Sequence, residues 1–155
     1  MSLVTLRLAA LSLLLAAGAC FAADVGPPAN DKLAGARSRI AEKNWTAAID
    51  GLKKVDDPAS ADWNNLMGYS LRKADPVANA EAAEKFYDAA LRIEPRHRGA
   101  LEYSGELYLM TGNLAKAEER LATLDKACFL PCEEYKDLKS AVARYKAAGN
   151  RYVAP

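Results

Sequence analysis

Three segments of the chain share one pattern, and they begin at Asn44, Asn79 and Asn113, which are 35 and then 34 residues apart. They read `NWTAAIDGLKKV`, `NAEAAEKFYDAA` and `NLAKAEERLATL`. In each segment, apolar or small residues follow the Asn at offsets of four, eight and eleven, which lie on one face of an α-helix. A repeat of this length predicts a stack of similar helical units. The residues on that face are Ala48, Leu52 and Val55, then Ala83, Tyr87 and Ala90, then Ala117, Leu121 and Leu124.

A second amphipathic segment precedes each of these helices. The three segments are `DKLAGARSRIAEK`, `DWNNLMGYSLRK` and `RGALEYSGELYLMTG`. Each unit is therefore predicted to be a helical hairpin. The Asn at the start of each second helix suits an N-cap, because its side-chain oxygen can accept a hydrogen bond from a free backbone N–H of the first turn.

Two glycines occupy matching places inside the predicted first helices. A glycine inside a helix is less favourable than alanine by roughly 1 kcal/mol, so Gly68 and Gly105 require another explanation. We interpret them as sites where a neighbouring helix passes too close for a Cβ atom. The small residues expected to face them across the hairpins are Ala83 and Ala117.

The pattern resembles the tetratricopeptide repeat family, whose 34-residue unit consists of two antiparallel helices. The resemblance covers residues 30–127 and implies an all-α fold, a right-handed α-solenoid of about three helix hairpins with a C-terminal capping helix. A plain helical bundle would require three registers to agree by accident. The matching positions are Gly105, Tyr108, Gly112, Asn113 and Ala117 in the third unit, Gly68, Leu71, Ala83, Tyr87, Ala90 and Pro95 in the second, and Asn44, Trp45, Ala48 and Leu52 in the first, where Ala36 stands in place of Gly.

The domain organisation follows from these units. The three repeats are expected at about 30–60, 61–97 and 98–129, and the capping helix at 130–148. A capping helix with one polar face is what the end of a repeat array needs. An extended leader is expected at 23–29 and a frayed tail at 149–155. The apolar face of the capping helix is predicted to hold Tyr135, Leu138, Val142 and Tyr145.

The first 22 residues are typical of a secretory signal peptide. One basic residue, Arg7, precedes an apolar run that is too short to span a membrane, and small residues lead to a cleavage site after Ala22. The sequence therefore predicts an exported protein, periplasmic or secreted. An alternative is lipidation at Cys20, because `AAGAC` resembles the lipobox of bacterial lipoproteins; the protein would then be a lipid-anchored subunit of an outer-membrane assembly complex.

Cys128 and Cys132 would be the two cysteines of the exported chain. Pro131 between them breaks any continuous helix, so a turn can bring the two sulfur atoms together. In an oxidising compartment we expect a structural disulfide that fastens the capping helix. Two alternatives remain open, a redox-active thiol pair and a copper site. Glu133 and Glu134 act against the first by raising a thiol pKa, and the second lacks a nearby His or Met.

The sequence offers little for catalysis. The histidine His97 is flanked by two arginines and is expected to be an exposed residue between repeats. No Ser, Asp or Cys stands at a recognisable spacing from it, and neither a phosphate-binding loop nor a zinc motif occurs. The formal net charge of +1 also argues against a nucleic-acid partner. We therefore predict no enzyme activity and no cofactor.

A protein or peptide partner is the remaining expectation. In the tetratricopeptide family the first helices line a concave groove that receives a peptide or a helix of a partner. The resemblance implies a non-catalytic interaction scaffold whose partner is not identified by the sequence. A mixture of charge and tyrosine suits a modest, polar interface. The residues that the resemblance places on this face are Arg37, Asn65, Tyr69, Arg72, Glu102, Tyr103 and Glu106.

Overall fold

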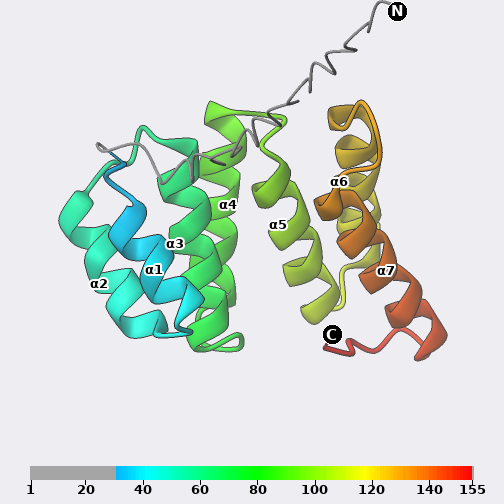
Figure 1. Cartoon of the computed structure of the whole chain (residues 1–155). Coiled ribbons are helices and arrows are strands. Elements are labelled where there is room, and N and C mark those ends of the chain that lie inside the picture. Colours follow the sequence, from blue (N-terminus) through cyan, green and yellow to red (C-terminus); the bar gives the residue numbers. More distant parts are fainter. Residues whose placement is uncertain (1–30, 155) are drawn as a thin grey trace, which may run out of the picture.

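The computed structural model describes residues 31–154, and all the regular structure within them is helical. Seven helices follow one another along the chain and form an elongated stack (Figure 1). The all-α solenoid predicted from the repeat is therefore confirmed. The helices are α1 (Ala34–Ala41), α2 (Trp45–Val55), α3 (Ala61–Ala74), α4 (Ala80–Ile93), α5 (Arg98–Met110), α6 (Leu114–Ala127) and α7 (Glu133–Ala147).

The helices pair as hairpins, α1 with α2, α3 with α4 and α5 with α6, and α7 packs on the last pair. The first helices of successive units also contact one another, from α1 to α3, from α3 to α5 and from α5 to α7. In the described chain, the backbones of α2, α4 and α6 make no comparable contact with one another. The row of first helices is therefore the inner side of the curve, and we call its surface the concave face.

Asparagine side chains cap two of the second helices as predicted. The Oδ1 of Asn44 accepts from the N–H of Ala47 at 3.2 Å, and that of Asn113 accepts from Lys116 at 3.1 Å. The prediction is wrong for Asn79, which makes no such bond and instead donates its Nδ2 to the carbonyl of Leu71 at 3.1 Å. The additional residues before α4 form a turn of their own, and this turn leaves Asn79 facing back towards α3.

The glycine at position 68 confirms the predicted close approach of two helices. A Cβ atom there would lie 2.8 Å from a ring carbon of Tyr87 and 3.1 Å from the carbonyl oxygen of Ala83. The prediction for Gly105 is wrong in its partner: a Cβ there would lie 2.6 Å from Cδ2 of Leu138 in α7, not against Ala117. The capping helix therefore uses the same close approach to the preceding unit that α4 makes with α3.

The turn inside the third hairpin requires a glycine. Gly112 has a φ of +80°, a conformation that L side chains rarely adopt. The equivalent turn of the first hairpin holds Lys43 at a φ of +57°, although Lys has no special preference for it. The first and third hairpins thus share a turn with positive φ, although only the third has glycine at that position.

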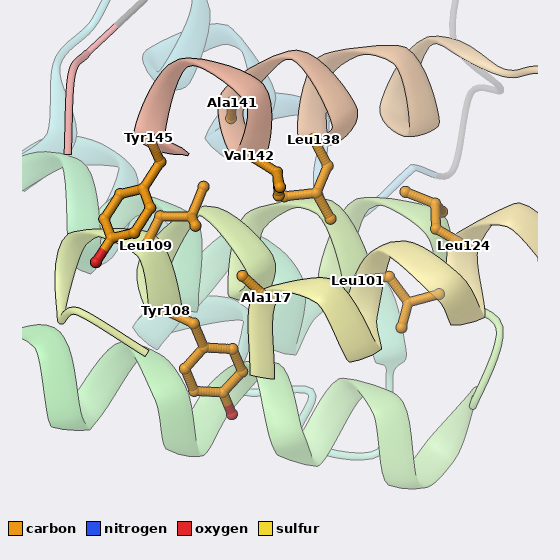
Figure 2. Packing of buried hydrophobic residues seen from close by; sticks show 9 residues of the cluster. All are labelled: Leu101, Tyr108, Leu109, Ala117, Leu124, Leu138, Ala141, Val142 and Tyr145. Carbon is orange, nitrogen blue, oxygen red and sulfur yellow. The ribbon is translucent and has the colours of Figure 1, made fainter. Parts of the chain in front are cut away.

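The largest core cluster joins the third hairpin to the capping helix. Figure 2 shows Leu138 and Val142 of α7 pointing towards α5 and α6, while Tyr108 extends away from α7. The hydroxyl of Tyr108 donates to Glu84 of α4 at 2.9 Å. The buried members of the cluster are Leu101, Tyr108, Leu109, Ala117, Leu124, Leu138, Ala141, Val142 and Tyr145.

The C-terminal segment is not the frayed tail that the sequence indicated. Gly149 and Asn150 both have positive φ values, of +68° and +60°, and they turn the chain back after α7. Tyr152 then packs against the C-terminal core cluster. The Tyr152 ring thus supplies an apolar contact that was not predicted from the sequence.

The signal peptide, the lipidation alternative at Cys20 and the extended leader all lie outside the described residues. Across residues 31–154, no helix is both long and apolar enough to cross a lipid bilayer.

A pair of glycine substitutions tests the close approach. Gly68→Ala should lower the free energy of unfolding by about 1–3 kcal/mol, because the new methyl group would overlap the Tyr87 ring and the α4 backbone. Gly51→Ala is the matched control, since a Cβ there meets nothing within 4 Å, and it should raise stability by about 0.5–1 kcal/mol. Urea unfolding followed by circular dichroism measures both; equal changes in the two variants would refute the packing explanation.

Candidate functional site

Two tyrosines from neighbouring units pack against each other on the concave face, with their ring planes tilted by 44°. The ring centroids of Tyr69 in α3 and Tyr103 in α5 are 4.5 Å apart. The guanidinium carbon of Arg72 lies 5.6 Å from each centroid, so the cation contacts both rings. Trp45 of α2 adds an edge contact to Tyr69 at 6.0 Å. Aromatic side chains of three helices thus form one continuous group, of which Tyr69 and Tyr103 lie on the concave face.

An ion pair joins the second and third units beneath the tyrosines. Nη1 of Arg72 donates to Oε2 of Glu106 at 2.7 Å, and the Arg72 side chain is only 3% exposed. A buried charge of this kind depends strongly on its partner, because removing one member leaves the other unpaired in a medium of low dielectric. The pair therefore fixes the position of α5 relative to α3.

Glu102 lies one helical turn before Glu106 and has a different environment. Its residue surface is 8% exposed, and its carboxylate accepts no hydrogen bond from any residue between 31 and 154. Burial raises its pKa to about 8, and the nearby carboxylates of Glu106, Asp137 and Glu134 act in the same direction. Glu102 is therefore largely protonated at neutral pH.

A pocket of about 200 Å³ opens between α5 and α7 beside this carboxyl group. The contribution of α7 to the site was not predicted from the sequence. The signal was present, because Asp137, Ser140 and Arg144 are spaced to share a helix face that flanks the apolar one. The residues lining the pocket are Glu102, Glu106, Asp137, Ser140 and Arg144.

The structure brings together six of the seven residues predicted for the concave face but encloses half of them. Asn65, Arg72 and Glu102 are buried, whereas an open polar surface was expected. The close contact between first helices leaves little room for side chains to reach solvent. Arg37 lies apart, bound to Asp62 at 2.9 Å near the start of α3.

The expectation that His97 is exposed is wrong. Its Nδ1 accepts a hydrogen bond from the N–H of Ala100 at 3.1 Å and so caps α5. In a neutral ring the proton must then lie on Nε2, which is 3.0 Å from Oδ1 of Asp62. Burial acts to raise the pKa of Asp62, but His97 and Arg37 together hold it below its usual range. His97 has a structural role that links α5 to α3.

Cys128 and Cys132 lie at the junction between α6 and α7. Their sulfur atoms are bonded, with the Cα atoms 5.9 Å apart. Both residues pack against the C-terminal core cluster, while Phe129 and Leu130 between them are exposed. This position is consistent with a disulfide that attaches the capping helix α7 to the third repeat unit. The described residues contain no group of three or more His, Cys, Asp or Glu side chains placed to hold a metal ion.

Comparison with known proteins agrees with this architecture. A family model described as a tetratricopeptide repeat matches residues 78–142, from the turn before α4 to the middle of α7. Over this segment the chain is similar to the tetratricopeptide repeat family, which supports the predicted resemblance. A tetratricopeptide array is typically a non-catalytic scaffold for protein interactions.

A solved structure has a similar fold. It is the Yersinia enterocolitica type III secretion chaperone SycD in complex with a peptide of the translocator YopD, with a TM-score of 0.61 and 16% sequence identity. The likeness covers 76% of this chain and 88% of that one. No sequence among the curated proteins matches this chain.

The protonation of Glu102 predicts a pH-dependent stability. The folded array keeps this carboxyl protonated up to about pH 8, while the unfolded chain ionises it near the usual value of 4.5, so its contribution to stability falls as pH rises between them. Glu102→Gln has no ionisable group at this position and avoids that loss. Between pH 5 and pH 8 we expect the free energy of unfolding of wild type to fall by on the order of 2 kcal/mol more than that of the variant, after allowance for partial solvent screening.

Urea titrations of wild type and variant at both pH values measure this difference. Glu119→Gln, which changes an exposed glutamate of α6, is the control and should follow wild type. A constant offset between wild type and Glu102→Gln at both pH values would contradict the protonated carboxyl.

Loss of the disulfide should weaken the attachment of α7. Replacing Cys128 and Cys132 together by Ser is expected to lower the free energy of unfolding by about 2 kcal/mol, the loop-closure contribution of so short a bridge.

For the wild type, intact mass after mild glutathione and alkylation should show no added label, because the bond packs against the core. Ready labelling, or a copper adduct in the mass spectrum, would instead support thiol or copper chemistry.

Proposed function

We propose that this protein is an exported, non-catalytic tetratricopeptide module that binds another envelope or secreted protein on its concave face. It acts by holding a partner and performs no chemistry on it. The observation that carries the proposal is the group formed by Tyr69, Tyr103 and Arg72, where two aromatic rings and a cation from adjacent units meet on one surface.

The aromatic group has the composition expected of an interaction site. Tyrosine is one of the residue types enriched where binding energy concentrates in protein interfaces, and the buried Arg72 lies against both rings. The two rings already pack against each other, so the tyrosines lose little conformational freedom when a partner binds. The buried Arg72–Glu106 ion pair supports the same rigidity, because it ties together the two helices that carry the tyrosines.

The likeness to SycD supports a peptide as the kind of partner. That structure contains a peptide of YopD on a scaffold of similar fold. The similarity is one of fold, and the residues of the concave face described above are those of this chain alone. The proposal therefore concerns the mode of binding, and the partner itself would be identified by experiment.

Export is proposed from the sequence. The charged start, short apolar run and small residues before Ala23 form the signal pattern, and an oxidising compartment would suit the Cys128–Cys132 pair. Fractionation of cells that express the tagged full chain would place it, and intact mass of the exported form would show either cleavage after Ala22 or acyl chains on Cys20.

Cross-linking in cells followed by identification of the linked proteins tests the binding face. The double variant Tyr69→Ala and Tyr103→Ala should lose the partner that wild type captures, because both aromatic contacts are removed. Tyr135→Ala is the matched control: it removes a partly buried tyrosine of α7 that packs against the C-terminal core cluster. If the double variant remains folded and captures every wild-type partner, the concave face is not the binding site.

A further inference from the structure

The loop between α6 and α7 presents two large apolar side chains to solvent. Phe129 is fully exposed and Leu130 is 72% exposed, whereas the cysteines on either side of the loop pack against the C-terminal core cluster. The disulfide closes the loop, with the Cα atoms of Cys128 and Cys132 only 5.9 Å apart, so the residues between them project from the surface. We call residues 128–132 the disulfide tip.

The fold does not require apolar residues at these exposed positions. Neither Phe129 nor Leu130 belongs to a core cluster of residues 31–154. A closed loop of this kind can hold polar residues equally well, and these would place no apolar surface in water. The tip therefore has the chemistry of a contact site and not that of a structural element alone.

The tip lies on the edge of the array at which the first helices begin. The second helices end at this edge, because they run antiparallel to the first (Figure 1). Three of the five large hydrophobic residues that are exposed within residues 31–154 lie here, Phe129, Leu130 and Ile93 at the end of α4. The contacts that join the starts of the first helices are Arg37 with Asp62 at 2.9 Å, Asp62 with His97 at 3.0 Å, and Arg98 with Glu134 at 3.7 Å.

The described chain also begins at this edge. Lys32, just before α1, contacts Asp57 of the turn between α2 and α3 at 3.8 Å. Cys20 precedes Asp31 by eleven residues, which span at most about 40 Å when fully extended. An acyl chain on Cys20, the alternative to cleavage after Ala22, would therefore hold this same edge close to a bilayer.

Charges of both signs surround the tip. Asp125 and Lys126 precede it, Glu133 and Lys136 follow it, and all four are exposed. Because these charges offset one another, an anionic headgroup would be neither strongly attracted nor strongly repelled. Contact at the tip therefore depends on its apolar side chains.

The size and shape of the tip favour a lipid surface over a protein. Two side chains offer far less area than the roughly 800 Å² that each side of a stable protein interface buries. Insertion into a bilayer needs no complementary surface, and Phe and Leu are typical of the face that interfacial segments bury in lipid. We propose that the disulfide tip inserts Phe129 and Leu130 into the apolar boundary of a lipid bilayer, so that this edge of the array faces the membrane.

This contact is separate from the concave face, because the tip lies at the junction of α6 and α7 and the tyrosine pair lies on α3 and α5. Two short side chains give weak, reversible attachment, and stable anchoring takes a second signal. The tip therefore acts as an orienting contact, with the chain before Asp31 or a membrane-bound partner as the second attachment.

Tryptophan fluorescence of the exported protein tests insertion, with phosphatidylcholine vesicles at millimolar lipid as the probe. In Phe129→Trp the emission of the new indole should shift to the blue, and lipids brominated on their acyl chains should quench it. The signal is taken as the difference from wild type, whose tryptophans lie in α2 and α3. Val77→Trp is the matched control: this position is 88% exposed but lies in the turn between α3 and α4, at the opposite edge, and should show neither effect.

A second change removes the neighbouring apolar side chain. Adding Leu130→Asp to Phe129→Trp should lower the apparent insertion constant, obtained by titrating the emission shift with lipid, by about tenfold or more. Circular dichroism should remain that of wild type, because Leu130 is exposed.

Three results would overturn the proposal. The first is an equal response of Phe129→Trp and Val77→Trp. The second is a shift that requires anionic lipid and disappears at high salt, which would indicate electrostatic adsorption. The third is a Phe129→Trp indole that stays in water on vesicles while the same position cross-links to a protein in cells, which would assign the tip to a protein partner.

Discussion

The fold depends on how closely successive helices approach one another at two glycines. At Gly68 the backbone of α3 lies against the Tyr87 ring and the Ala83 carbonyl, and at Gly105 the backbone of α5 lies against Leu138 of α7. A side chain at position 68 would press on the Tyr87 ring and the Ala83 backbone, whereas one at position 105 would displace the end of the Leu138 side chain. One contact closes a hairpin and the other attaches the cap, so the same device holds both kinds of junction.

This tight packing also determines the character of the concave face. Because the first helices are in contact, polar side chains between them are enclosed, and Arg72 becomes a buried cation that serves Glu106 and two tyrosine rings at once. Glu102 is largely enclosed by the same geometry, and burial raises its pKa. The face therefore combines an aromatic centre with a buried cation and a pocket lined mainly by polar and charged side chains.

The repeat register was sufficient to predict the hairpins, the capping helix and the close approach at Gly68, because these follow from local periodicity. It could not show that Gly105 meets Leu138, since Leu138 belongs to α7, outside the repeat. The position of Asn79 depended on a turn whose geometry the sequence does not specify. For His97 and Glu102, exposure was misjudged because burial there comes from neighbouring units. Periodicity identifies the face of a helix, but what covers that face depends on the stacking distance.

The outer helices are joined in a different way from the inner ones. Long side chains bridge α4 and α6, through Lys116 with Glu84 at 3.1 Å and Arg120 with Asp88 at 2.9 Å. Partly exposed ion pairs contribute little to stability, about 1 kcal/mol or less each. The inner edge of the solenoid is thus stiff and its outer edge compliant. A change in curvature would alter the distance between α4 and α6 while preserving the contacts between the first helices, so the array would bend about its concave side.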